Sequence, residues 1–255
     1  MTRLERLTRQ MQADGNKAVV PFLTAGYPDP DTFASLVEAV ARSGCRLMEM
    51  GIPFSDPVAD GPVIQASSQA ALGHGMNLAQ VLDLAGRAHA EQGLNVVLMG
   101  YLNPLLHFGA ERFARACGEH EVAGLIIPDL PSDEAGPLRD LLQEQDVTLV
   151  DLVAPTTTPE RLGRITSRAA GFLYLVSVSG VTGAGLSDSP DLMSYLDRVA
   201  AKTDLPRYVG FGVSGPEQAA EICRHADGVI IGSKLIRLVE EAGSPVKAAE
   251  HLTSF

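Results

Sequence analysis

The segment around Glu49 combines a carboxylate inside an apolar run with a second carboxylate in the loop that follows. Glu49 stands within Leu47–Gly51, and Asp60 follows in a proline-rich loop. Side chains on a strand point to alternate faces, so Glu49 faces away from the helices if Met48 and Met50 face them. Burial raises the pKa of a carboxyl group, which suits a group that gives and takes a proton near neutrality. This pair of carboxylates indicates acid–base chemistry at the end of a strand.

Both carboxylates also have a structural interpretation. Glu49 could belong to a buried ion pair, because an unpaired charge inside an apolar strand is costly. Asp60 precedes Gly61 and Pro62 and could form a turn or cap the next helix. Spacing alone does not separate this role of Asp60 from a catalytic one.

The lysines argue against Schiff-base chemistry. None stands in the C-terminal half of an expected strand, where the Schiff-base lysine of a barrel aldolase would lie. Lys234 comes nearest, but it begins an expected helix. Carbon–carbon chemistry in this chain would therefore depend on carboxylates. The lysines are Lys17, Lys202, Lys234 and Lys247.

Glycines cluster at the ends of the last three expected strands. Phosphate sites of barrels are commonly built there, from the loops after strands seven and eight and the start of a short helix. Glycine lets the backbone approach a phosphate, and free N–H groups with the helix dipole stabilise the anion. One glycine pair would indicate only a turn, whereas three groups favour a phosphate site. The groups are Ser179–Gly183, then Gly210 with Gly212, and finally Gly232 with Ser233, which opens the expected helix Ser233–Val239.

Short apolar runs alternate with amphipathic stretches along the chain. The runs are too short for helices and several are rich in β-branched residues, so they predict strands. Apolar residues at consecutive positions are typical of parallel strands covered on both faces. Helices are predicted at Arg3–Gln12, Pro30–Ser43 and Ser132–Gln145, the last with Ser132 as its cap. The expected strands are Ala18–Leu23, Leu47–Gly51, Val96–Met99, Leu125–Ile127, Thr148–Val153, Phe172–Val176, Tyr208–Phe211 and Val229–Ile231.

Eight strand–helix units behind an extra N-terminal helix favour a closed (β/α)₈ TIM barrel of the α/β class. The alternative is an open, doubly wound sheet, but the first strand is not followed by the GxGxxG of its dinucleotide-binding form. The chain has 255 residues and shows no linker or low-complexity tract. We therefore expect residues 1–255 to form a single barrel domain.

The composition of the chain limits the kinds of ligand and partner that it could bind. The formal net charge of −11 disfavours nucleic acid and anionic membranes, and leaves a small phosphate ligand held by local groups. Cys45, Cys117 and Cys223 lack metal-ligand spacing and are expected to be reduced thiols. The charged N-terminus and the lack of a run of about 20 apolar residues indicate a cytoplasmic protein without a membrane span.

Several motifs together resemble the tryptophan synthase alpha family over nearly the whole chain. The segment from Glu49 to Asp60 is highly specific for that family, whereas the last twenty residues are not. The resemblance implies a lyase of tryptophan biosynthesis that splits indole-3-glycerol phosphate into indole and glyceraldehyde 3-phosphate by a retro-aldol reaction. The matching motifs are Pro21–Pro28, Glu49–Pro57, Ala59–Pro62, Tyr101–Pro104, Pro128–Pro131, Gly180–Gly183 and Gly210–Gly212.

The resemblance also implies roles for single residues. Glu49 would protonate indole C3 and take the proton of the glycerol hydroxyl, and Asp60 would hold the indole N–H. Thr182 would close a loop over the substrate, and Val178 departs from relatives that carry Arg at this place. Substrate contacts are implied for Phe22, Ile64, Tyr101, Asp129, Tyr174 and Thr182, and phosphate contacts for Gly183, Gly210, Gly212, Gly232 and Ser233.

The same resemblance implies a beta subunit that carries pyridoxal phosphate and consumes the indole in a heterotetramer. Asp56, Pro57, Asn103 and Pro104 are expected to face this subunit. The chain itself is expected to need no cofactor and no metal. The alternatives are a stand-alone indole-3-glycerol phosphate lyase, another phosphate-binding barrel lyase or isomerase, and a regulatory subunit without activity. The presence of both carboxylates disfavours the last.

Overall fold

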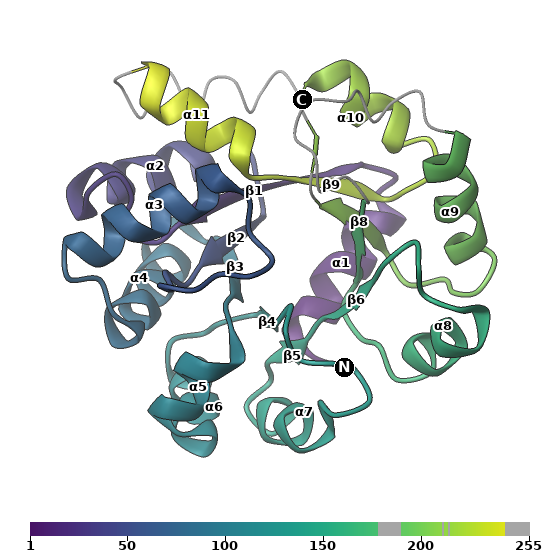
Figure 1. Ribbon diagram of the computed structural model, residues 1–255, viewed down its shortest axis with the longest axis horizontal. Helices are drawn as coiled ribbons and strands as arrows, with labels where there is room; N and C mark the ends of the chain where they lie inside the picture. Colours follow the sequence, from purple (N-terminus) through teal and green to yellow (C-terminus); the bar gives the residue numbers. More distant parts are fainter. Residues whose placement is uncertain (178–189, 211, 214, 243–255) are drawn as a thin grey trace.

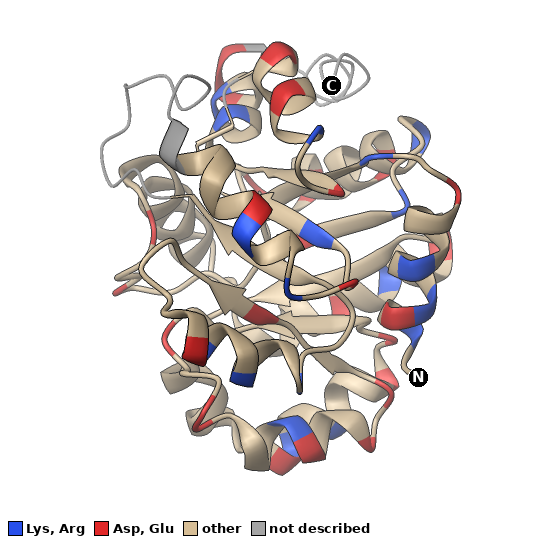
Figure 2. Ribbon diagram, turned by 90° about the vertical axis from the view of Figure 1, so that its right-hand side faces the viewer, with Lys and Arg blue, Asp and Glu red and all other residues tan. Residues whose placement is uncertain are grey.

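A ring of parallel strands surrounded by helices forms the molecule (Figure 1). The computed structural model describes residues 1–177, 190–210, 212–213 and 215–242. Charged residues lie mostly on the outer helices and loops, and the strands carry few of them (Figure 2). The predicted α/β barrel is confirmed, and the open sheet is excluded.

The strands follow the order β5-β4-β3-β2-β1-β9-β8-β7-β6. β5 and β6 are two pieces of the one strand expected at Thr148–Val153, separated at Val150. β5 pairs with β4 and β6 pairs with β7, so this single segment joins both ends of the order and closes the ring. The bounds are β1 Ala18–Thr24, β2 Leu47–Gly51, β3 Asn95–Met99, β4 Gly124–Ile126, β5 Thr148–Leu149, β6 Asp151–Val153, β7 Leu173–Val176, β8 Arg207–Gly210 and β9 Gly228–Ile231.

The helices lie outside the ring, apart from α1. The predicted start of α7 at Ser132 is wrong, because residues 132–134 form a turn and the helix begins at Gly136. Pro137 fits only the first turn of a helix and thereby sets the start. The bounds are α1 Arg3–Ala13, α2 Pro30–Arg42, α3 Pro62–Gly73, α4 Leu78–Gln92, α5 Leu102–Phe108, α6 Ala110–Glu119, α7 Gly136–Gln143, α8 Pro159–Thr166, α9 Pro190–Ala200, α10 Pro216–Ile222 and α11 Ser233–Ala242.

Each strand buries both of its faces in a different cluster of side chains. Inside the ring, Phe22, Val97 and Tyr174 belong to one cluster. Outside it, Met48 and Leu98 pack with the helices in a second cluster. Burial on both faces explains why the strands are apolar at consecutive positions.

Helix α1 closes one end of the ring. Thr2 accepts a hydrogen bond from the Glu5 amide, and the Glu5 carboxylate accepts one from the Thr2 amide, which forms a capping box. Leu4 is fully buried, and a Cβ on Gly124 would lie 2.7 Å from its methyl group. Because Gly124 begins β4, α1 covers the N-terminal end of the strands. The carboxyl end of the ring, called the mouth below, is left for a ligand.

Candidate active site

Glu49 lies on the inner face of β2, level with Phe22 on β1 and Val97 on β3. Its neighbours Met48 and Met50 belong to the outer cluster, so the predicted direction of Glu49 is confirmed. The residue is 1% exposed. Neither carboxylate oxygen has a hydrogen-bond partner among the described residues. The alternative of a buried ion pair therefore finds no support in the part of the chain that the structure describes.

The environment of Glu49 favours its neutral form. Burial and, by a smaller amount, the nearby charge of Asp60 together raise the pKa of Glu49 from 4.5 to about 8. At neutral pH the side chain therefore carries a proton that no neighbouring described residue accepts. Such a group is a general acid whose conjugate base is strong enough to take a proton back.

Asp60 reaches the mouth from the loop between β2 and α3. Its amide donates to the Pro57 carbonyl at 3.1 Å, and its carbonyl accepts from Gln65 Nε2 at 2.8 Å. The N-cap of α3 is Gly61, and no side chain caps this helix, so the interpretation of Asp60 as a helix cap is wrong. Burial raises the pKa of Asp60 to about 6, opposed by a hydrogen bond from the Tyr101 hydroxyl. Its carboxylate faces the site and is ionised at neutral pH.

Tyr101 connects this loop to the barrel. Its hydroxyl accepts a hydrogen bond from the Ala59 amide at 3.0 Å and donates one to the Asp60 carboxylate. The ring lies 5.4 Å from that of Phe54, centroid to centroid. The side chain of Tyr101 is buried. Tyr101 therefore holds Asp60 and the residue before it over the mouth.

Apolar and aromatic side chains surround the two carboxylates. Phe22, Ile64 and Tyr174 all belong to the inner cluster. The pKa of the Tyr174 hydroxyl is raised, first by burial and then by the charges of Glu49 and Asp60. Tyr174 thus lies within electrostatic range of both carboxylates, and an aromatic ligand would find apolar contacts and acid–base groups in one space.

Glycines make room for these aromatic rings. A Cβ on Gly210 would lie 2.1 Å from the Tyr174 hydroxyl oxygen, and one on Gly51 would lie 2.6 Å from the Phe22 ring. Gly232 also faces the Phe22 ring, at 3.2 Å from a Cβ position. Gly210 and Gly232 therefore have a packing role that the sequence did not reveal. Their phosphate contacts stay predictions.

The carboxyl ends of β8 and β9 have the features of an anion site. Gly212, after β8, has a φ of +79°, in the left-handed region that favours glycine. Ser233 begins α11 directly after the residue that follows β9, so the first N–H groups of this helix have no partner within it. Val178, Thr182 and Gly183 lie outside the described residues.

Asp129 has a structural role that the sequence did not indicate. Its two carboxylate oxygens accept from the Leu102 amide at 3.0 and 3.3 Å. This contact satisfies a free N–H group at the start of α5, where the helix dipole also favours a negative charge. Asp129 therefore fixes the helix start that positions Tyr101. A substrate contact of Asp129 stays a prediction.

The expected partner residues differ in exposure. Asp56 and Asn103 are exposed and Pro104 is half-buried, but Pro57 is buried within the chain. Two large apolar side chains near these residues in the sequence are also exposed. Val58, which follows Pro57, is 84% exposed, and Leu106, two residues after Pro104, is 58% exposed.

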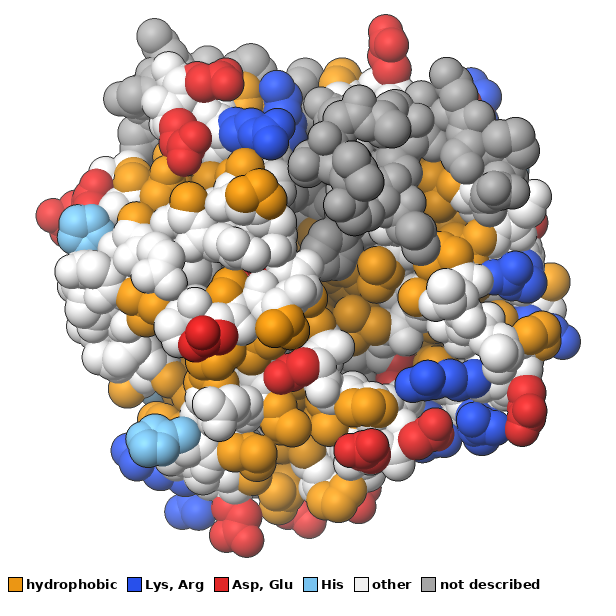
Figure 3. All heavy atoms as spheres, in the orientation of Figure 1, with side chains coloured by type: hydrophobic (Ala, Val, Ile, Leu, Met, Phe, Trp, Pro, Cys, Tyr) orange, Lys and Arg blue, Asp and Glu red, His pale blue; other side chains and the backbone are white. Residues whose placement is uncertain are grey.

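Figure 3 shows hydrophobic side chains gathered below the centre of this face, in the area of α5 and α6. Contiguous exposed apolar surface is typical of an interaction site. The sequence alone did not single out Val58 and Leu106, because exposure is a tertiary property.

A barrel whose mouth holds two carboxylates with raised pKa values is suited to moving protons on an apolar substrate. The glycine-rich ends of β8 and β9 add a place for a phosphate. Within the described residues, no group of three or more His, Cys, Asp or Glu side chains could hold a metal ion. The fold and the site thus define an acid–base enzyme of the phosphate-binding α/β-barrel class.

Comparison with known proteins specifies the family. Residues 8–254 match the model of the family described as tryptophan synthase alpha chain. The tryptophan synthase alpha chain of Laribacter hongkongensis (strain HLHK9) is 43% identical over 245 residues, which are 96% of this chain and 93% of the relative. That of Citrifermentans bemidjiense is 41% identical over 241 residues, 94% of this chain and 90% of the relative.

Solved structures of tryptophan synthase chains have the same fold as this chain. The structure of Mycobacterium tuberculosis tryptophan synthase has a TM-score of 0.91 and 36% identity, and covers 99% of this chain and 96% of that chain. The alpha chain of Legionella pneumophila subsp. pneumophila has a TM-score of 0.89 and 35% identity, and covers 100% of this chain and 95% of that chain. The chain belongs to the tryptophan synthase alpha chain family. The reaction of this family is the lyase cleavage of indole-3-glycerol phosphate to indole.

Proposed function

We propose that Glu49 and Asp60 carry out the cleavage of indole-3-glycerol phosphate in the mouth of the barrel. The observation that carries this assignment is the state of Glu49. It is a buried carboxyl group without a hydrogen-bond partner among the described residues, and its pKa is about 8. A second carboxylate with a pKa of about 6 lies close enough to influence it.

In the first step, protonated Glu49 gives its proton to C3 of the indole ring. The ring then carries a positive charge that is shared with its nitrogen. The ionised carboxylate of Asp60 accepts a hydrogen bond from the indole N–H and stabilises this charge. A charge-stabilising group that is already in place lowers the barrier because it does not have to reorganise during the reaction.

In the second step, the Glu49 carboxylate takes the proton of the hydroxyl on the carbon attached to C3. The bond between C3 and that carbon breaks, and its electron pair returns to the ring. The hydroxyl carbon becomes the aldehyde carbon of glyceraldehyde 3-phosphate. Glu49 ends the cycle protonated, as it began, and no further reactant is consumed.

The remaining site residues position the substrate. Phe22, Ile64 and Tyr174 would contact the indole ring, since their side chains form the apolar surface beside the carboxylates. Gly212 and the start of α11 at Ser233 would hold the phosphate through backbone N–H groups. Thr182 and Gly183, which the family resemblance adds to this group, lie outside the described residues.

The proposal includes the partner. The exposed apolar side chains Val58 and Leu106, together with Asp56, Asn103 and Pro104, support a beta subunit docked over α5 and the β2–α3 loop. Indole would pass to that subunit in a heterotetramer. Pyridoxal phosphate would belong to the beta subunit, and this chain would need no cofactor of its own. We place the protein in the cytoplasm, in agreement with its three free cysteines.

Glu49→Gln tests the assignment, because it removes proton transfer and keeps the shape of the side chain. We expect kcat for indole release to fall by about 100-fold or more, since general acid–base catalysis contributes about 10²–10⁴-fold. Binding of glyceraldehyde 3-phosphate should stay within about twofold. Retention of more than about a tenth of the wild-type kcat would contradict the role of Glu49.

Indole release should be measured with and without the beta subunit. A rate that the beta subunit does not change would favour the alternative of a stand-alone lyase, which releases free indole. A rise in the rate with the beta subunit would support the heterotetramer.

A further inference from the structure

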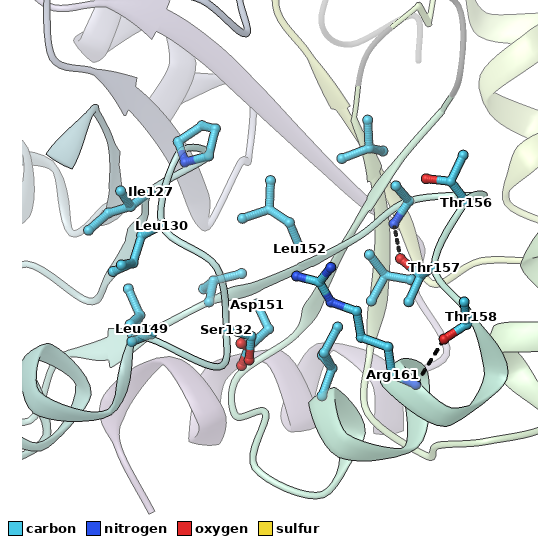
Figure 4. A pocket seen from close by; sticks show the side chains of 17 residues that line it. Ile127, Leu130, Ser132, Leu149, Asp151, Leu152, Thr156, Thr157, Thr158 and Arg161 are labelled. Atoms are coloured by element: carbon cyan, nitrogen blue, oxygen red, sulfur yellow. Dashed lines mark hydrogen bonds between the residues drawn. The ribbon is translucent and has the colours of Figure 1, made fainter.

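A cavity of about 330 Å³ lies beside the mouth, between β6 and α8. Glu49, Asp60 and Tyr174 do not line it. Apolar and polar side chains both line it, and Figure 4 shows the Arg161 side chain directed into the space between them. The apolar lining includes Ile127, Leu149, Val153 and Ile165, and the polar lining includes Ser132, Asp151 and Arg161.

Asp151 is a buried acid on the helix side of the sheet, with 3% exposure. Leu152, next to it on β6, packs against the inner cluster, so Asp151 points the other way. Arg139 Nη2 donates to Asp151 Oδ1 at 2.9 Å, and Arg139 Nη1 donates to the Leu149 carbonyl at 3.0 Å. Asp151 Oδ2 has no partner among the described residues. Asp151 Oδ1 is therefore hydrogen-bonded, whereas Oδ2 is a buried acceptor at the cavity without a donor among the described residues.

Ser132 presents a second unsatisfied atom. It lines the same cavity as Asp151 and is 9% exposed, and its Oγ finds no partner in the described part of the chain. Its carbonyl accepts from Arg168 Nη1 at 3.2 Å, which holds the backbone in place. Buried polar atoms are nearly always hydrogen-bonded, so two such atoms at one cavity indicate that a third group completes them.

Arg161 supplies an uncommitted positive charge. In the described residues its guanidinium makes no hydrogen bond or ion pair, whereas Arg164 and Arg168 both bind Asp133. Figure 4 shows the Arg161 side chain extending across the cavity. Since Arg139 already neutralises Asp151, the charge left at the cavity is positive and favours an anionic group on a ligand.

We propose that this cavity is a second binding site, for a small aliphatic carboxylate that also carries a hydroxyl or ammonium group. Arg161 binds the carboxylate, and the hydroxyl or ammonium donates to Asp151 Oδ2 with Ser132 Oγ alongside. The aliphatic part packs against Val153 and the apolar residues around it. A cavity of about 330 Å³ accommodates a molecule of this size. The inference does not depend on the reaction proposed for the mouth.

The ligand class is tested by calorimetric titration of the full chain with four matched probes. L-leucine and 2-hydroxy-4-methylpentanoate carry both polar groups. 4-Methylpentanoate lacks the donor, and 3-methylbutylamine lacks the carboxylate. We expect saturable binding of the first two probes, about tenfold or more tighter than binding of the last two. Equal affinity for all four, or no binding below about 10 mM, overturns the proposal and leaves a cavity filled by water.

Variants locate the binding. Arg161→Gln, on the surface of α8, should weaken L-leucine binding by about tenfold or more, and Ser132→Ala should weaken it by a smaller factor. Arg164→Gln is the matched control on the same helix and should bind as the wild type does. Unchanged binding in Arg161→Gln overturns the proposal. Displacement of L-leucine by glyceraldehyde 3-phosphate also overturns it, because the probe would then occupy the mouth.

Discussion

Glu49 and Asp60 differ in protonation because their surroundings differ. Glu49 stands inside the ring with no partner among the described residues, and Asp60 lies at its rim with a hydrogen bond from Tyr101. The first therefore holds a proton up to a pH of about 8, and the second loses its proton at a pH of about 6. Their surroundings thereby suit two similar side chains to the two roles of the proposed cleavage, one as acid and one as anion.

This difference predicts a bell-shaped pH profile for kcat/KM. Activity should fall below pH values of about 6, where Asp60 becomes neutral, and above about 8, where Glu49 loses its proton. The two midpoints belong to the coupled pair rather than to either residue alone. The measurement is steady-state indole release at several pH values on both sides of these midpoints. A profile that stays level through the alkaline midpoint would contradict Glu49 as the acid.

The stability of the fold should also depend on Glu49. The pKa of Glu49 is raised from 4.5 to about 8 in the folded protein, so folding favours the protonated form. The stabilising contribution is complete below pH 4.5 and is lost as the pH rises through about 8.

Glu49→Gln does not titrate and should therefore become the more stable protein at alkaline pH. We expect its advantage in the free energy of unfolding to grow from near zero to the order of a few kcal/mol. Urea unfolding of both proteins across this pH range gives the difference. A difference that is independent of pH would mean that Glu49 is not held in its neutral form.

At the scale of elements, packing between β7 and β8 determines the shape of the site around Glu49 and Asp60. The Tyr174 ring on β7 occupies the space that the missing side chain of Gly210 leaves on β8. Any side chain at position 210 would therefore move the aromatic surface beside Glu49.

Gly210→Ala should therefore displace Tyr174 and lower kcat/KM for cleavage by about tenfold or more, with a loss of stability of about 1–3 kcal/mol. Gly163→Ala on α8 is the matched control, because a Cβ there meets no atom within 4 Å. In that variant activity should be unchanged and stability equal or higher by up to about 1 kcal/mol. Steady-state kinetics gives kcat/KM and thermal unfolding gives the stability of the two variants. Equal behaviour of both would show that Gly210 has no packing role.

At the scale of the whole molecule, the barrel separates support from function. α1 fills the N-terminal end of the ring, and the carboxylates, the glycine-rich ends of β8 and β9 and the exposed apolar residues all lie toward the other end. A net charge of −11 opposes phosphate binding at long range, which is why we propose that backbone groups at the strand ends hold the phosphate. No described helix is long and apolar enough to cross a membrane.

Leu106→Glu tests the docking face. The side chain is 58% exposed, so the change should leave the fold intact, but burial of the new charge against a partner is costly. We expect the affinity for the beta subunit to fall by about tenfold or more, while cleavage by the chain alone stays within about twofold. Ser35→Glu, exposed on α2, is the control and should assemble normally. Calorimetric titration with the beta subunit measures both. Unchanged affinity in Leu106→Glu would place the interface elsewhere.

Local periodicity was sufficient for much of the fold and for the direction of the principal acid. Alternation along a strand depends only on neighbouring residues, and it predicted that Glu49 faces inward opposite to Met48 and Met50. The apolar runs likewise predicted the barrel, with the fifth strand divided at Val150 as the main difference. The start of α7 was misplaced, because a favourable cap residue at Ser132 was outweighed by the position of Pro137.

Contacts between distant segments were decided by the tertiary structure alone. Spacing left Asp60 as either a cap or a catalyst. The structure excludes the cap, and the proposed catalytic role depends on Tyr101, which the fold brings to the same loop. The same holds for Asp129 at the start of α5 and for Asp151 at the second cavity. Local sequence encodes which way a side chain points, whereas its partners are chosen by packing between elements that are far apart in the chain.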